Sequence, residues 1–325
     1  MPDLNEKQSP INRLSYKGDI AQIIKRLCEK YDLGLIKDYS IIAVGYEDCN
    51  VNIRTEKGVY LAKMFAKTRT SENITRYSNI IERISDAGIH HPKLLKTKKG
   101  EIVYTDSGVN LVLLNFVEGK TFLDLNRAPN SKELRDILEQ AAKINTINYK
   151  PSYLFDSWAI PNIEKMLRKT SKFIDKEDLI LVKKVIQKFK SIPINKLPHC
   201  FVHGDFTKAN VVKGNDGKVY ILDFSVSNWY PRIQELAVIA ANLAYDENSP
   251  QTLQQRCKNI VDEYSKFNKL TSDEIEHLPA YALAGSAMEF MGAHQEKFIK
   301  GNDTEETNYW LNLGREGLRS SLINL

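Results

Sequence analysis

A change of hydrophobic pattern part-way along the chain constrains the fold more than any other feature of this sequence. Residues 39–65 contain short runs rich in β-branched and aromatic residues, which predict strands. Residues 70–88 carry apolar side chains at three- and four-residue steps, which predicts one helix, and two further strand-like runs lie within 101–117. Beyond this point the pattern is mostly helical. The sequence therefore predicts an α+β protein with a small β-rich lobe at 1–117 and a larger helical lobe at 118–325.

Two local patterns refine this division. Ile20, Ile23, Ile24 and Leu27 have helical spacing, so a helical extension is expected before the first strand. A single β island at residues 201–224 interrupts the helical lobe. Because ligands bind preferentially between domains, a site between the two lobes is expected.

The bulk properties place the chain among ordinary globular proteins. Hydrophobic residues make up 42%, charged residues 27%, and the formal charge is +5. The first ten residues lack an apolar stretch and no run is long enough to span a bilayer, so a cytoplasmic protein without a membrane partner is expected. The four cysteines have no metal-ligand spacing and are interpreted as free thiols. The lysine clusters at 96–100 and 183–190 lack interleaved aromatics, so no nucleic-acid partner is expected; the oligomeric state stays open.

The β island carries the residues suited to chemistry. Its two strand-like runs flank Gly214–Gly217, a typical hairpin turn. Antiparallel pairing across that turn would bring Asn210 beside Asp223, and Asp205 lies on the loop just before them. Amide and carboxylate oxygens are ligands suited to Mg²⁺. Phosphoryl transfer from ATP uses this combination of metal ligands and a carboxylate that accepts the acceptor's proton.

One lysine in the small lobe fits the same chemistry. Lys63 lies inside the apolar run VYLAKMFA, where burying an ammonium group is costly unless it meets an anion. A strand lysine of this kind can hold the phosphates of ATP.

The segments HGDFTKAN and ILDFS resemble the aminoglycoside phosphotransferase and choline kinase superfamily, which shares the protein-kinase-like fold. The resemblance implies that Asp205 is the catalytic base and that Asn210 and Asp223 are the Mg²⁺ ligands. It also implies ATP as the phosphoryl donor and a small-molecule hydroxyl as the acceptor.

The resemblance extends over most of the chain. VGYEDCNVNIRTEKGVYLAKMF looks like the family's nucleotide-covering hairpin and lysine strand, which implies that Lys63 binds ATP. LVLLNFVEG resembles the inter-lobe hinge, where backbone groups of Asn115 to Val117 would meet adenine. YPRIQELA resembles the segment in which Glu235 would brace the catalytic loop. GYEDCN, LPHCFVHGDF and the ELA helix start suggest the homoserine kinase and hydroxylysine kinase branch.

The sequence departs from the family pattern at three places. Ser225 stands where protein kinases have glycine, and Gly45 is the one glycine in the segment that replaces a glycine-rich loop. Tyr77 occupies the helix position of the acid that normally pairs with the strand lysine. Glu72 or Glu82 could substitute, so the acid that pairs with Lys63 is left open.

Several individual residues allow more than one interpretation. Gly119–Thr121 suggests a P-loop, but Leu114 stands where that motif needs glycine, so Gly119 is interpreted as a hinge turn. Lys208 could neutralise the γ-phosphate or be a solvated loop lysine. Trp229 and Tyr230 could line the acceptor pocket or pack in the core.

Together these features predict an ATP- and Mg-dependent phosphotransferase acting on a small-molecule hydroxyl. An amino-acid or amino-alcohol hydroxyl, homoserine- or hydroxylysine-like, is the first expectation. An aminoglycoside or sugar kinase, or a nucleotide-binding pseudokinase without turnover, is the alternative. The preference for ATP over GTP stays open.

Overall fold

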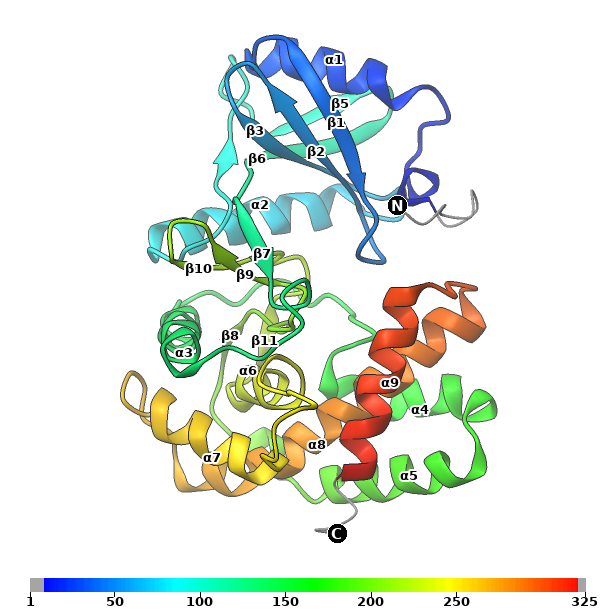
Figure 1. Ribbon diagram of the computed structural model, residues 1–325, viewed down its shortest axis with the longest axis vertical. Helices are drawn as coiled ribbons and strands as arrows, with labels where there is room; N and C mark the ends of the chain where they lie inside the picture. The colour runs from blue at the N-terminus through cyan, green and yellow to red at the C-terminus, as the bar shows by residue number, and fades with distance from the viewer. Residues whose placement is uncertain (1–8, 321–325) are drawn as a thin grey trace. The chain divides into compact units, whose positions relative to one another are not determined.

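The computed structural model describes residues 9–320, and its chain divides into two compact units, Met1–Glu118 and Gly119–Leu325 (Figure 1). The N-terminal unit is built on an antiparallel sheet and the C-terminal unit is mostly helical. The α+β class predicted from the change of hydrophobic pattern is confirmed.

The N-terminal sheet runs in the order β1-β2-β3-β6-β4, with β5 also paired to β6, and all its pairs are antiparallel. Its strands are β1 (Ile36–Ile42), β2 (Cys49–Thr55), β3 (Val59–Met64), β4 (Leu94–Leu95), β5 (Val103–Asp106) and β6 (Val109–Asn115). The β2–β3 register pairs Asn50 with Lys63, which fixes the residues that share a face with this lysine.

Two helices and a short 3₁₀ turn, η2 (Pro10–Arg13), accompany this sheet. The predicted N-terminal helical extension is α1 (Ile20–Tyr31), which buries Ile23, Ile24 and Leu27 in one cluster with residues of β2, β3 and β6. Helix α2 (Ser71–Asp86) begins with a capping box made by Thr70 and Asn73 and buries the apolar face seen in the sequence. The extension is therefore part of the core of this unit.

The C-terminal unit surrounds the long helix α8 (Ser272–His294), which packs against most of the other helices (Figure 1). The other α-helices of this unit are α3 (Ser131–Asn145), α4 (Ile163–Thr170), α5 (Lys176–Lys190), α6 (Ile233–Val238), α7 (Leu253–Tyr264) and α9 (Glu305–Ser320). The unit also contains the 3₁₀ turns η3 (Ile160–Asn162), η4 (Ser171–Phe173) and η5 (Ile194–Lys196). Two π-helical segments, η6 (Ile239–Leu243) and η7 (Gln295–Ile299), follow α6 and α8. Met288 and Met291 of α8 are buried.

The predicted β island forms parts of two small antiparallel sheets. One contains β7 (Gly119–Thr121), β9 (Val211–Gly214) and β10 (Val219–Ile221), and the other pairs β8 (His199–Val202) with β11 (Asn228–Pro231). The interpretation of Gly119 as a hinge turn is wrong, because Gly119 lies in strand β7 and pairs there with Gly214 of β9. A Cβ at Gly119 would lie 2.3 Å from the carbonyl oxygen of Lys213, so close strand pairing explains the glycine.

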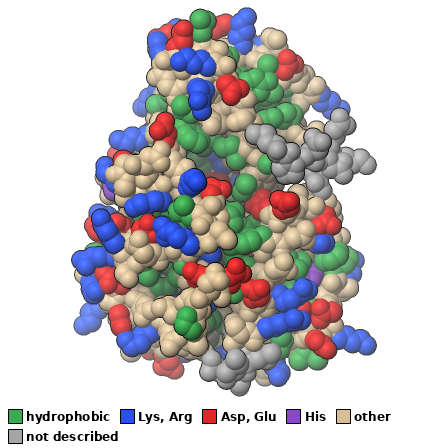
Figure 2. All heavy atoms as spheres, viewed as in Figure 1, with side chains coloured by type: hydrophobic (Ala, Val, Ile, Leu, Met, Phe, Trp, Pro, Cys, Tyr) green, Lys and Arg blue, Asp and Glu red, His purple; other side chains and the backbone are tan. Residues whose placement is uncertain are grey.

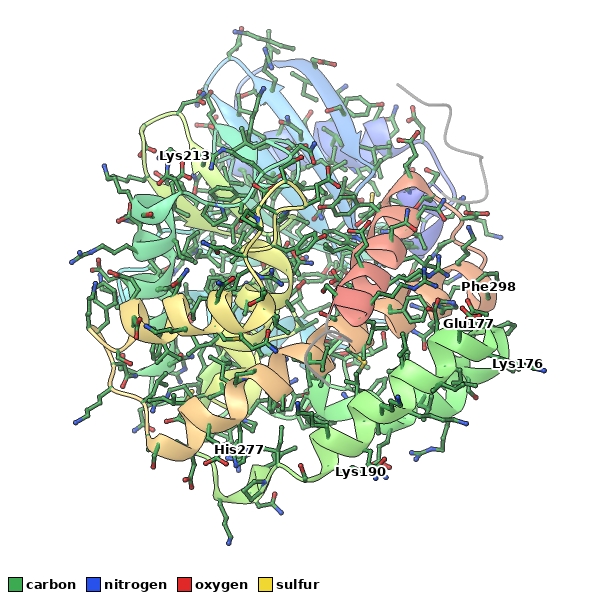
Figure 3. All side chains as sticks on the ribbon, turned by 60° about the horizontal axis from the view of Figure 1, so that its bottom comes forward. Lys176, Glu177, Lys190, Lys213, His277 and Phe298 are labelled. Carbon is green, nitrogen blue, oxygen red and sulfur yellow. The ribbon has the colours of Figure 1, made fainter. Side chains whose placement is uncertain are left out.

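The surface is mixed in charge. Lysine and arginine side chains occur among acidic ones on the face shown in Figure 2. The lysines of α5 are exposed, and Figure 3 shows Lys176 and Lys190 directed outward, so this cluster is a solvated helix face. Within residues 9–320, no helix combines the length and apolar content that crossing a bilayer requires.

Candidate active site

The β9–β10 hairpin brings two of the predicted site residues near each other. Val211 pairs with Ile221, and beyond this pair the backbone N–H of Leu222 donates to the carbonyl of Asn210 at 2.8 Å. Asn210 therefore lies opposite the residue that precedes Asp223. The turn at Gly214–Gly217 creates this arrangement, as its sequence predicts.

Asp205 and Asn210 contact each other directly. The amide nitrogen of Asn210 donates to a carboxylate oxygen of Asp205 at 2.6 Å and to its carbonyl at 3.2 Å. Because these bonds engage the amide nitrogen, the amide oxygen of Asn210 is the atom directed to other partners. The pair therefore presents one carboxylate and one amide oxygen, both hard ligands.

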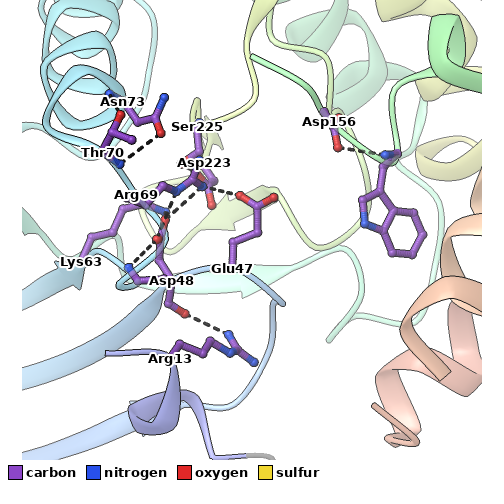
Figure 4. Close-up of polar contacts among 12 residues, drawn as sticks. Arg13, Glu47, Asp48, Lys63, Arg69, Thr70, Asn73, Asp156, Asp223 and Ser225 are labelled. Carbon is purple, nitrogen blue, oxygen red and sulfur yellow. Dashed lines mark hydrogen bonds and ion pairs between the residues drawn. The ribbon is translucent and has the colours of Figure 1, made fainter. Parts of the chain in front are cut away.

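Asp223 is held in an unusual backbone conformation. Its φ is +50°, in the left-handed region that aspartate tolerates better than most residues. One carboxylate oxygen accepts hydrogen bonds from the backbone N–H of Ser225 at 3.1 Å and from its hydroxyl at 2.5 Å (Figure 4). The serine that replaces glycine in the family pattern thus orients this carboxylate. Backbone strain of this kind is concentrated at functional sites.

His203 joins the loop of Asp205 to the strand that leads to Asp223. The backbone N–H of Asp205 donates to Nδ1 at 3.0 Å, so the ring proton is on Nε2, which donates to the carbonyl of Leu222 at 2.7 Å. The ring is fully buried and packs edge-on against Phe224. The imidazole therefore fixes both segments of the site in one geometry.

Glu235 braces the same loop, as the family resemblance implies. Its two carboxylate oxygens accept from the backbone N–H groups of His203 at 2.8 Å and Gly204 at 2.9 Å. Burial raises the pKa of Glu235 to about 7, against the opposing effect of these two hydrogen bonds. The bracing contact predicted from the sequence is confirmed.

Burial also lowers the pKa of two imidazoles, His203 and His91, to about 4. Both side chains are almost inaccessible to solvent, which disfavours their charged forms. Each ring is therefore neutral in the folded protein at neutral pH.

The low pKa of His91 predicts acid sensitivity. Between pH 6.5 and 4 the unfolded chain binds a proton at this ring that the folded chain does not, so its contribution to stability is complete above pH 6.5 and is lost as the pH falls towards 4. We expect the free energy of unfolding of the wild type, relative to His91→Gln, to fall by about 2 to 3 kcal/mol between pH 7 and 4.5. Urea titrations at several pH values measure this difference. The same change at His277, which is partly exposed, is the control, and a pH-independent difference for His91→Gln contradicts the prediction.

Lys63 is buried in β3 and pairs with an acid that the sequence analysis did not name. Its ammonium lies 3.3 Å from a carboxylate oxygen of Asp48, and both side chains are nearly inaccessible (Figure 4). The acid left open by the sequence is thus Asp48, whereas the two candidates Glu72 and Glu82 are exposed on α2. The ring of Tyr77, at the position of the family's acid, instead lies 5.5 Å from the ammonium as a cation–π partner.

Asp48 also organises the segment around Lys63. Its carboxylate accepts from the backbone N–H of Ala66 at 3.1 Å and lies 3.3 Å from the guanidinium of Arg69. Arg69 also forms an ion pair with Glu47, and Arg13 donates to the carbonyl of Asp48 at 2.9 Å (Figure 4). One buried carboxylate therefore holds two cations and a backbone amide.

The predicted hinge segment begins at the last residue of β6, Asn115. The backbone N–H of Asn115 donates to Lys93 at 3.1 Å, and that of Phe116 donates to Val59 at 3.2 Å. These two N–H groups are thus engaged by the sheet. Val117 lies two residues beyond the end of β6.

Three further residues have clear environments. Lys208 is only 4% exposed, so its interpretation as a solvated loop lysine is wrong. Burial lowers the pKa of its ammonium, which lies 5.9 Å from the ring centre of Tyr245. Tyr230 is buried in β11 with Ala159 and Val202, which is the packing role, whereas Trp229 is partly exposed.

The site's donor set suits a hard cation. Within the described part of the chain, no group of three or more histidine, cysteine, aspartate or glutamate side chains is arranged to hold a metal. The candidate ligands are instead an amide and a carboxylate, Asn210 and Asp223, with Asp205 bonded to the first of them. Two or three protein oxygens are what Mg²⁺ needs when phosphates supply the remainder.

The fold and this loop are those of a phosphotransferase. The model of the phosphotransferase enzyme family matches residues 38–265, so the chain belongs to that family, and it is a small-molecule kinase. It is 23% identical over 270 residues to a homoserine kinase of Parvibaculum lavamentivorans, covering 80% of this chain and 81% of that one. A homoserine kinase of Rhizobium meliloti is 21% identical over 269 residues, covering 82% and 81%. The superfamily and the branch suggested by the sequence motifs are confirmed.

Solved structures agree on the architecture. A spectinomycin phosphotransferase, solved with ADP and spectinomycin, superposes with a TM-score of 0.70 at 14% identity and covers 93% of this chain and 97% of its own. A choline kinase of Streptococcus pneumoniae has a TM-score of 0.65 at 14% identity, covering 93% and 99%. The predicted protein-kinase-like fold is therefore confirmed.

Proposed function

We propose that this protein transfers the γ-phosphoryl group of ATP to a hydroxyl of a small amino acid or amino alcohol. The observation that carries the proposal is the loop in which Asp205 contacts Asn210 while His203 ties it to the segment of Asp223. In this proposal Asp205 orients the acceptor hydroxyl and takes its proton. Asn210 and Asp223 hold Mg²⁺, which when bound neutralises charge on the phosphates.

The N-terminal residues have the complementary role of binding the nucleotide. Lys63 contacts the α- and β-phosphates, with Asp48 in the part of the acid that holds such a lysine in place. The backbone of Asn115 and Val117 binds adenine, with the N–H of Val117 as the donor. The neighbour solved with ADP supports nucleotide use in this fold.

The acceptor class rests on the relatives. The curated relatives described above act on homoserine by name, which favours a hydroxylated amino acid. An aminoglycoside or a sugar is the alternative, supported by the spectinomycin phosphotransferase fold. The pseudokinase alternative depended on Tyr77, and the Lys63–Asp48 pair removes its main support.

Acceptor-stimulated release of ADP tests the proposal. We expect ADP release in the presence of Mg²⁺ to increase at least about tenfold when the right acceptor is added, because water is a poorly positioned substitute for a bound hydroxyl. The panel contains homoserine, hydroxylysine, ethanolamine, choline, a hexose and spectinomycin. Phosphorus NMR identifies the product as a phosphate monoester. Nucleotide binding without stimulation by any of these compounds would support the pseudokinase instead.

A further inference from the structure

A π-helical segment places one side chain between the catalytic loop and helix α8. Asn242 lies in η6, which continues α6, and single π turns of this kind occur frequently at functional sites. Its amide oxygen accepts from the backbone N–H of Lys208 at 2.9 Å, and its amide nitrogen donates to Glu289 at 2.5 Å. Because the backbone donor fixes which end of the amide is oxygen, the nitrogen must face the carboxylate. Glu289 is thus linked to the loop three residues after Asp205.

Glu289, which is partly buried, differs from the fully buried acids of this unit in what it contacts. Glu274 pairs with Arg232, Asp178 with two arginines of α9, and Glu296 with Lys300, whereas Glu235 accepts from two backbone N–H groups. Within residues 9–320, Glu289 has one amide donor and no cation within ion-pair distance. These other acids are satisfied by the fold, whereas one oxygen of Glu289 is available to a ligand.

The surroundings of Glu289 are electrostatically incomplete. The pKa of this carboxyl is raised to about 8, chiefly by burial and also by the negative charge of Asp205, against the lowering effects of the hydrogen bond from Asn242 and of the Lys208 ammonium. The side chain is only partly enclosed, so a ligand can reach it. A desolvated carboxylate without a counter-ion is costly, and a cation bound there would remove that cost.

The charges near Lys208 point to the same class of ligand. Asp246, Glu247 and Glu289 all act on its ammonium, and Glu289, Glu247 and Glu316 act on Tyr309. The acidic groups near Lys208 thus outnumber the two cations there, Lys208 itself and Arg256. An anionic ligand would be repelled by them, whereas a primary amine would be attracted.

We propose that Glu289 binds the cationic amino group of the acceptor. In this proposal the hydrogen bond from Asn242 holds the Glu289 carboxylate at a fixed position relative to the loop that carries Asp205. The inference rests on the proposed function and makes it more specific. The acceptor's amino group then lies at Glu289 and its reacting hydroxyl at Asp205, so the distance between these two side chains determines how far apart the two groups of the acceptor must be. Glu289 is therefore a specificity residue, and Asn242 is a positioning residue.

Glu289→Gln tests the proposal, because glutamine retains the oxygen that accepts from Asn242 and removes only the charge. Two matched pairs of acceptors serve as probes: homoserine with 4-hydroxybutyrate, and ethanolamine with ethylene glycol. We expect the variant to raise KM for the amine-bearing member of a pair by about 10- to 100-fold, as for loss of a charged hydrogen bond. The kcat and the KM for ATP should change less than about twofold, because Glu289 contacts only the amino group of the acceptor in this proposal. For the same reason, kcat and KM for the amine-free member of each pair should change less than about twofold.

Controls and a binding measurement separate this inference from the proposed function. Glu276→Gln makes the same change on an exposed part of α8 and should leave all constants unchanged. Calorimetric titration of the full chain with each probe is carried out in parallel. Amine-dependent binding that Glu289→Gln abolishes, without turnover, would support the inference and refute the function. Turnover with equal preference for the amine-free probes, unchanged discrimination in the variant, or binding of neither pair would overturn the inference.

Discussion

The Asp205→Asn variant is expected to lose turnover by about 10²- to 10⁴-fold, the contribution typical of a positioned general base. Asparagine has the same shape as aspartate and its amide oxygen can still accept from the amide nitrogen of Asn210, which contacts Asp205 at 2.6 Å in the wild type. The loop should therefore keep its geometry, because His203 and Glu235 hold it through other bonds. What disappears is the ability to take the proton of the acceptor hydroxyl.

Kinetics and folding are measured separately for this variant. The expected loss lies in kcat, whereas KM for ATP and the thermal unfolding temperature should remain close to those of the wild type. Asp273→Asn, an exposed aspartate in the first turn of α8, is the control for the chemical change. Retention of more than a few per cent of wild-type turnover by Asp205→Asn would refute the role assigned to Asp205.

The sequence predicted the parts of the site that depend on local chain geometry. The turn at Gly214–Gly217 determines the β9–β10 register, and that register alone brings Asn210 towards the segment of Asp223. The bracing by Glu235 came from the family resemblance, since its partners lie more than thirty positions away. Short-range turn chemistry can be derived from a single sequence, whereas long-range pairing cannot.

The sequence did not reveal the roles of Asp48, Asn242 and Glu289. Their contacts depend on the pairing register of strands and on which way side chains point around a helix, and hydrophobic pattern determines neither. Asp48 immediately precedes β2, in which Asn50 pairs with Lys63, so the β2–β3 register would have placed this acid near the lysine. The link between Asn242 and Glu289 joins positions 47 apart through a π segment. A π turn shifts every later side chain around the helix, and regular 3.6-residue spacing cannot anticipate it. Lys208, whose backbone N–H donates to Asn242, is also buried, although its loop position suggests exposure.

Removing the charge of Asp48 is expected to have the second large effect. Asp48→Asn leaves the ammonium of Lys63 and the guanidinium of Arg69 without their shared counter-ion, although the new amide oxygen can still accept from Ala66. Breaking a buried ion pair by removing one partner costs about 3 to 5 kcal/mol. Since Lys63 is 4% exposed, water cannot replace the lost carboxylate. We expect a corresponding loss in the free energy of unfolding measured with urea.

Nucleotide binding should weaken in the same variant for a distinct reason. Asp48→Asn removes the carboxylate that helps to position the ammonium of Lys63, so KM for ATP should rise by about tenfold or more while KM for the acceptor stays unchanged. Asp86→Asn, at the exposed end of α2, is the matched control. An unchanged KM for ATP in a destabilised but folded Asp48→Asn protein would mean that the pair serves stability alone. A rise in KM for ATP at temperatures where the variant is fully folded would identify Asp48 as the acid that positions the phosphate-binding lysine.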